Sequence, residues 1–119
     1  MALTRDYKET IRQRAEADPK FAAALLQEAL EAVFKGDPET GRVILRELVN
    51  STIGFEILAE ELDKPSKSIH RMLSARGNPT MDNLTSILVA LQKHLATDLK
   101  AGVLPHDKTS SRTANRRPA

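Results

Sequence analysis

A group of polar side chains near the middle of the chain could form hydrogen bonds with nucleic acid. The group is Ser66, Lys67, Ser68, His70, Arg71 and Arg76. Lysine and arginine can donate to O6 and N7 of guanine, and serine can donate or accept. The same side chains can bind phosphate oxygens, which position a protein on a duplex without reading its sequence. These residue types and their spacing predict a DNA-binding site.

Charges are segregated along the sequence around this group. The acids that precede it are Glu56, Glu60, Glu61 and Asp63. The bases that follow are Lys64, Lys67, Arg71 and Arg76, with no acid before Asp82. Because the whole chain has a formal net charge of only +2, a local basic patch favours a directed polyanion site over general attraction. The alternative is an ordinary solvated helix face.

Two short helical patterns must position these side chains. A break at Asp63, Lys64 and Pro65 separates them, and Pro65 lies near the start of the second, where its missing N–H is harmless. The inward-facing positions are Phe55, Leu58, Ala59, Leu62, Ile69, Met72 and Leu73. Ala59 is small, which lets the two helices approach closely. The layout predicts a helix-turn-helix over residues 55–74, with the start of its second helix facing base edges.

Helix start signals predict further helices before this unit. Asp18-Pro19 and Asp37-Pro38 each place an acid at the N-cap and a proline at the first helical position. The alanine-rich helix between these two signals is apolar over most of its surface, as far as Phe34. Its apolar faces either belong to the core or pair with a second copy of the chain.

One more helix follows the unit, and either Thr80 or Asp82 can cap it. Its apolar residues at helical spacing are Met81, Leu84, Ile87, Leu88, Leu91 and Leu95. Aromatic residues make up only 3% of the chain, and a supply of leucine, alanine, isoleucine and valine suits helices more than sheets. We therefore predict an all-α fold, a compact bundle of about five helices.

The chain divides into three parts by pattern. Residues 1–18 form an arm or a short helix, residues 19–99 form the helical DNA-binding domain, and residues 100–119 form a disordered basic tail. Residues 101–119 hold four bases and one acid, a net charge of +3, whereas the first 100 residues hold 14 bases and 15 acids. The four bases are Lys108, Arg112, Arg116 and Arg117. The tail is either a passive end or a source of extra phosphate contacts.

Other functional classes lack a signal in the sequence. There is no cysteine, and the chain has neither a signal peptide nor an apolar run long enough to cross a membrane, which favours the cytoplasm. His70, His94 and His106 match no metal motif. A glycine-rich phosphate loop is also missing, so we expect no enzymatic activity and no cofactor.

The stretch LAEELDKPSKSIHRML, followed by GNP and LTSILVALQ, resembles the lambda-repressor-like helix-turn-helix family. More narrowly, the chain resembles the addiction-module antidote proteins, which are HigA-like antitoxins, because an alanine-rich helix and a GDPE turn precede that stretch. The resemblance covers about residues 4–98. It implies a transcriptional regulator that reads bases with Ser66, Lys67 and, one turn further on, Arg71.

The chain departs from that family at three positions. Asp63 replaces the usual turn glycine and must tolerate an unusual φ, Lys64 replaces an apolar residue, and Phe55 replaces a polar residue near phosphate. Any phosphate contact there must come from backbone N–H groups. Because one recognition helix reads only a few base pairs, we expect a homodimer on duplex DNA. The alternative function is an antitoxin that binds and neutralises a toxin and autoregulates its operon.

Overall fold

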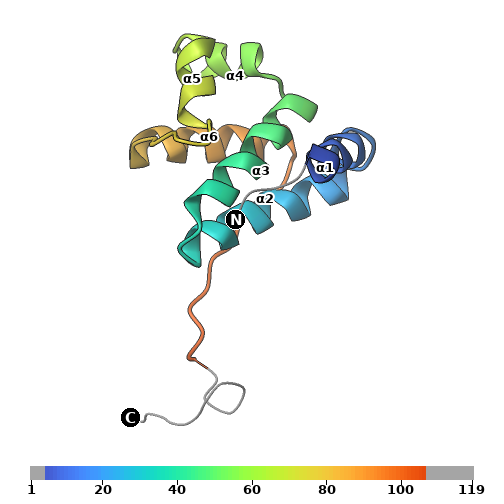
Figure 1. Cartoon of the computed structure of the whole chain (residues 1–119), viewed down its shortest axis with the longest axis vertical. Coiled ribbons are helices and arrows are strands. Elements are labelled where there is room, and N and C mark those ends of the chain that lie inside the picture. Colours follow the sequence, from blue (N-terminus) through green and yellow to red (C-terminus); the bar gives the residue numbers. More distant parts are fainter. Residues whose placement is uncertain (1–4, 107–119) are drawn as a thin grey trace.

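The computed structural model describes residues 5–106, and within this range the chain forms six helices and no strand (Figure 1). The helices are α1 (Arg5–Ala17), α2 (Pro19–Phe34), α3 (Pro38–Ser51), α4 (Phe55–Leu62), α5 (Ser66–Met72) and α6 (Met81–His94). The expected all-α fold is confirmed. The helix count exceeds the expected five because Arg5–Ala17 forms a helix of its own.

Capping side chains begin three of the helices. The carboxylate of Asp18 accepts from the Lys20 backbone N–H at 3.0 Å, and that of Asp37 accepts from the Thr40 N–H at 3.3 Å. A proline follows each of these aspartates at the start of the helix, as predicted. At α6 the hydroxyl of Thr80 accepts from a backbone N–H, so Thr80, rather than Asp82, is the cap.

The most extensive contact between helices joins α2 and α3. Gly41 of α3 is buried against α2, where an added Cβ would lie 2.8 Å from Val33 Cγ2 and 3.1 Å from the Ala29 carbonyl oxygen. A glycine therefore lets the two backbones approach. The buried side of α2 faces its neighbours within the chain, but Phe34 is 62% exposed. Phe34 lies roughly a third of a turn away from the direction of Ala22 and Ala29, which leaves it outside the core.

Helix α1 packs on both α2 and α3. Its Ile11 and Ala15 are buried in the core, and Arg12 donates to the Glu47 carboxylate of α3 at 2.7 Å. Glu47 is only 6% exposed. The hydrogen bond to Glu47 and its negative charge raise the pKa of the Arg12 guanidinium. A buried carboxylate is costly unless it is paired, and α1 supplies the opposite charge.

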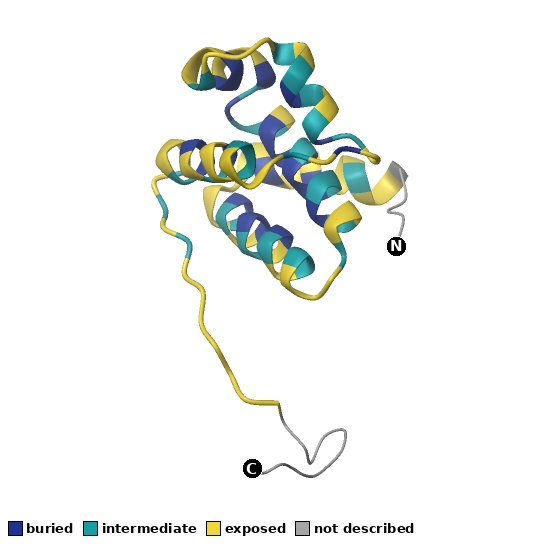
Figure 2. Ribbon diagram, turned by 90° about the vertical axis from the view of Figure 1, so that its left-hand side faces the viewer, coloured by how far each residue is buried: buried dark blue, intermediate teal, exposed yellow. Residues whose placement is uncertain are grey.

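The last three helices pack at the other end of the bundle, where α4 contacts both α5 and α6. The fully buried side chains there are Leu58, Ile69, Leu73, Ile87 and Leu91. Figure 2 shows these helices with their exposed residues turned outward. Met81 is 82% exposed, because it lies roughly a third of a turn from the line of the buried Ile87 and Leu91.

After α6 the described chain has no regular element up to residue 106. Its first part returns along α6, where the Leu99 N–H donates to Gln92 Oε1 at 2.7 Å. The predicted basic residues of the tail lie outside the described residues. Among the helices of residues 5–106, none has the length and apolar character that a membrane span requires.

Candidate nucleic-acid interface

The junction between α4 and α5 is a short turn built on a left-handed residue. Asp63 ends α4 with φ 53° and ψ 49°, so the unusual φ expected at this position is confirmed. Aspartate adopts this conformation more readily than most residues, because its short polar side chain can bond locally. The turn is closed by the Lys64 N–H, which donates to the Ala59 carbonyl at 3.0 Å.

The inner side of α5 is anchored in the core. Ile69 and Leu73 are fully buried, and Ala59 of α4 is 7% exposed beside the start of α5. Met72 is half-buried. Because α5 has only seven residues, these apolar contacts hold it in place; an isolated helix of that length is not stable in water. The opposite side is left free to meet a ligand.

The outer side of α5 carries Lys67 and Arg71, one turn apart and both exposed. Ser68 and Arg71 also line an open hollow, to which Lys64 and Arg76 contribute from the segments on either side of the helix. The residues that complete this hollow are Pro65, Met72, Gly77 and Asn78. It therefore holds three cationic side chains and no acid, which suits the phosphate groups of a polyanion.

Two members of the predicted group face α4 instead. The ring of His70 stacks on Phe55 with centroids 3.8 Å apart and planes 18° apart. Ser66 lines a second hollow together with Glu56 and Glu60 of α4. The structure thus brings Ser68, Arg71 and Arg76 to one hollow and places Ser66 and His70 beside α4, while Lys67 is exposed one turn before Arg71. No sequence signal distinguished these two sides.

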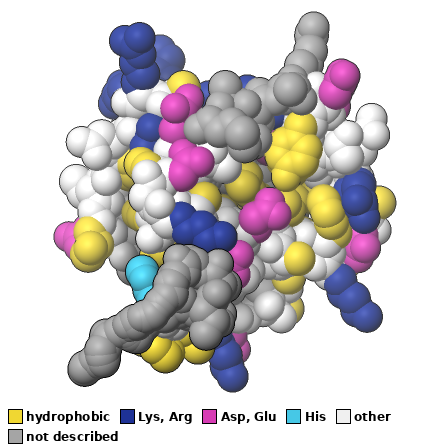
Figure 3. Space-filling model, turned by 60° about the horizontal axis from the view of Figure 1, so that its bottom comes forward, with side chains coloured by type: hydrophobic (Ala, Val, Ile, Leu, Met, Phe, Trp, Pro, Cys, Tyr) yellow, Lys and Arg dark blue, Asp and Glu magenta, His cyan; other side chains and the backbone are white. Residues whose placement is uncertain are grey.

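The two sides of α5 differ in charge. The hollow beside α4 is lined by Glu56, Glu60 and Asp63 and contains a single base, Lys64. These three acids are exposed. A polyanion approaching α5 is therefore repelled on the α4 side and attracted on the side of Arg76. On the face shown in Figure 3, at the end of the molecule away from α4 and α5, acids and bases are intermixed.

The loop that carries Arg76 is fixed by two contacts that the sequence did not reveal. Arg42 of α3 donates to the Ser74 carbonyl at 3.0 Å and to the Ala75 carbonyl at 2.7 Å. Gly77 is buried where an added Cβ would collide with the Met72 carbonyl. Arg42 is distant in sequence, so no local pattern identifies it, whereas the Gly-Asn-Pro sequence marked the turn at Gly77.

Other chemistry gains no support from residues 5–106, in which histidine, aspartate and glutamate form no group of three that could hold a metal ion. Comparisons of the chain with protein-family models, curated proteins and solved structures find no match. The charged surface at α5 is therefore the feature of the molecule that indicates a function.

Proposed function

We propose that this protein is a sequence-specific DNA-binding regulator of transcription, in which α4 and α5 form a helix-turn-helix of the lambda-repressor-like kind. The observation that carries the proposal is the outer side of α5, where Lys67 and Arg71 are exposed above a helix anchored by Ile69 and Leu73. A short helix that is rigidly backed and basic on its free side fits the major groove.

Roles follow from where each side chain lies. Lys67 and Arg71 are exposed on the outer side of α5 and would donate to base edges, with arginine favouring guanine. Arg76 and Lys64 lie at the two ends of the hollow beside α5 and would hold phosphates, with Ser68 between them. Phosphate contacts fix the register of the protein, and base contacts select the sequence.

The turn geometry adds support. The left-handed Asp63 lets α5 leave at a steep angle from α4, and the small Ala59 is buried beside the start of α5. The family's polar first position is Phe55 here, and it is buried under His70. A phosphate contact at the start of α4 would therefore use backbone N–H groups alone.

Selection of bound DNA from a random pool at stated salt concentration tests the function. We expect one enriched sequence, and Lys67→Ala and Arg71→Ala should each weaken binding to it by about 1–3 kcal/mol. Lys35→Ala, which removes an exposed lysine at the far end of α2, is the matched control and should bind like the parent. Failure to enrich any sequence, or equal affinities for all four proteins, would contradict the proposal.

A second candidate function is that of an antitoxin, and one observation favours it. The acidic hollow of Glu56, Glu60 and Asp63 fits a basic protein partner, such as a nucleic-acid-cleaving toxin. Co-expression with the protein encoded next to it is the test. The double variant Glu56→Lys/Glu60→Lys should lose neutralisation while keeping its preferred DNA sequence; unchanged neutralisation would rule this surface out.

A further inference from the structure

The outer side of α6 leaves apolar side chains uncovered. Met81 is 82% exposed and Val89 is 54% exposed, whereas Ile87 and Leu91 on the opposite side of the helix are fully buried. Met81, Thr85 and Val89 are spaced by four, so they form one stripe along the helix. Nothing within residues 5–106 packs over this stripe.

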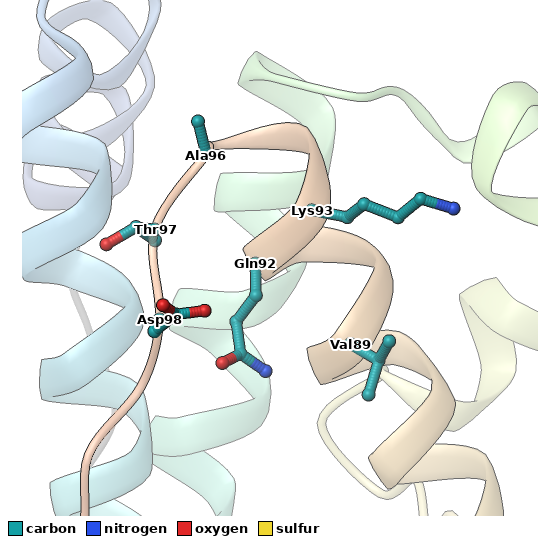
Figure 4. A pocket seen from close by; sticks show the side chains of 6 residues that line it. All are labelled: Val89, Gln92, Lys93, Ala96, Thr97 and Asp98. Atoms are coloured by element: carbon teal, nitrogen blue, oxygen red, sulfur yellow. The ribbon is translucent and has the colours of Figure 1, made fainter.

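A hollow lies at the C-terminal end of the same stripe (Figure 4). Its lining residues are Val89, Gln92, Lys93, Ala96, Thr97 and Asp98. Ala96 has a left-handed φ of 51°, which turns the chain back to form the far wall. The Gln92 amide is fixed by donating to the Leu88 carbonyl at 3.2 Å and accepting from the Leu99 N–H at 2.7 Å. These two hydrogen bonds therefore fix the position of Gln92 in the wall of the hollow.

Opposite charges lie at the two ends of the stripe. Asp82 is exposed in the first turn of α6 and Lys93 in the last. They lie on the same edge of the stripe, while Met81 and Gln92 lie on the other edge. The pattern is thus complementary to itself when the helix is reversed end to end.

We propose that α6 packs antiparallel against α6 of a second copy of this chain, around a twofold axis near its midpoint. Asp82 then faces Lys93 of the second copy, and Ser86 faces Val89 of the second copy. The twofold axis sets each edge of the stripe against the same edge in the second copy. Met81 and Gln92 share one edge, so Met81 enters the hollow beside Gln92 of the second copy. The exposed charges Asp82 and Lys93 and the exposed apolar residues Met81 and Val89 thus each face a residue of the second copy.

The antiparallel direction is selected by charge. A parallel pairing places Asp82 against Asp82 and Lys93 against Lys93, whereas the antiparallel pairing forms two ion pairs and sets the helix dipoles in opposition. Two four-turn helices bury less than about 1,200 Å² in total, so the dimer is weak and dissociates on dilution. The pairing is independent of the DNA-binding proposal, and its tests use no DNA.

Sedimentation over a range of protein concentrations tests the pairing. We expect a monomer–dimer equilibrium in the parent, weakened by Val89→Asp and by Asp82→Lys, each by about tenfold or more in Kd. The double variant Asp82→Lys/Lys93→Asp restores the opposite charges and should recover most of the loss. Phe34→Asp, at another exposed apolar residue, is the control and should dimerise like the parent.

Cross-linking tests the direction, since the chain has no cysteine of its own. The single variants Asp82→Cys and Lys93→Cys, mixed and treated with a short bismaleimide, should give the mixed dimer, identified by mass. Each variant alone should give little, because identical positions lie about 16 Å apart along the paired helices. A parent that stays monomeric at every concentration, dimers insensitive to Val89→Asp, or self-linking as efficient as mixed linking would each overturn the proposal.

Discussion

The guanidinium of Arg42 binds the Ala75 carbonyl at 2.7 Å and so ties α3 to the loop that leaves α5. The same side chain also reaches the Ser74 carbonyl. This residue links α3 to the position of Arg76, although it is not itself part of the proposed DNA surface. Two different nitrogens of its planar group bind the two carbonyls in a fixed geometry, whereas a lysine has a single donor nitrogen.

Arg42→Ala should destabilise the fold by about 1–3 kcal/mol, because the Ala75 carbonyl loses the Arg42 donor and the Ser74 carbonyl keeps only the Gly77 N–H. Arg42→Lys keeps the charge but replaces two donor nitrogens with one, so it should fall between the parent and the alanine variant. Urea denaturation of the three proteins measures the difference. If lysine and alanine variants are both as stable as the parent, the link does not contribute.

Gly77→Ala should also destabilise the protein, since the new Cβ would collide with the Met72 carbonyl and lie 2.6 Å from that of Arg71. Backbone atoms cannot give way cheaply, and overpacking of this kind costs about 1–3 kcal/mol. Gly102→Ala, in open space, is the matched control. Melting temperatures of the two variants should differ clearly; equal values would show that the loop shifts without cost.

Ala59→Leu should push α4 and α5 apart, because the residue is buried beside the turn. We expect a loss of about 1–3 kcal/mol in stability, and DNA affinity should fall together with it, unlike the effect of Arg71→Ala. Ile57→Leu, on the exposed side of α4, is the control. Normal melting and normal binding in Ala59→Leu would mean that the helices do not meet there.

Acid should abolish the contribution of Asp37 as a charged cap. Hydrogen bonds from Thr40 hold the pKa of Asp37 below its ordinary value. The folded state therefore binds this proton less tightly than the unfolded state, and the stabilisation is complete above about pH 4, the unfolded pKa. It is lost as the pH falls through the folded pKa. The stability difference between the parent and Asp37→Asn, measured against pH, should shrink on acidification; a constant difference would contradict this.

The parts of the fold that the sequence predicted correctly depend on neighbours in the chain. The caps at Asp18 and Asp37, and the left-handed Asp63, are properties of a few adjacent residues, and the structure confirms all three. Met81 and Phe34 are exposed despite their apolar type, because they lie out of phase with the buried positions of their helices. Burial depends on that phase together with the helices packed opposite.

The candidate site divides in the same way. The position of the basic helix could be predicted, since charge segregation and the break at residues 63–65 are local. That Ser66 and His70 face α4 could not, because the stacking of His70 on Phe55 depends on the angle between two helices. The bond from Arg42 to Ser74 spans 32 residues, and a single sequence carries no signal for such a pair.

The bond between Arg12 and Glu47 has a consequence for the smallest part of this chain that can be isolated. A fragment beginning at residue 19, at the boundary that the sequence pattern marks, would keep Glu47 and lose its counter-charge. It would also uncover the core surface that Ile11 and Ala15 occupy. The first helix is thus part of the folded bundle, and removal of α1 by a protease should destabilise helices α2–α6.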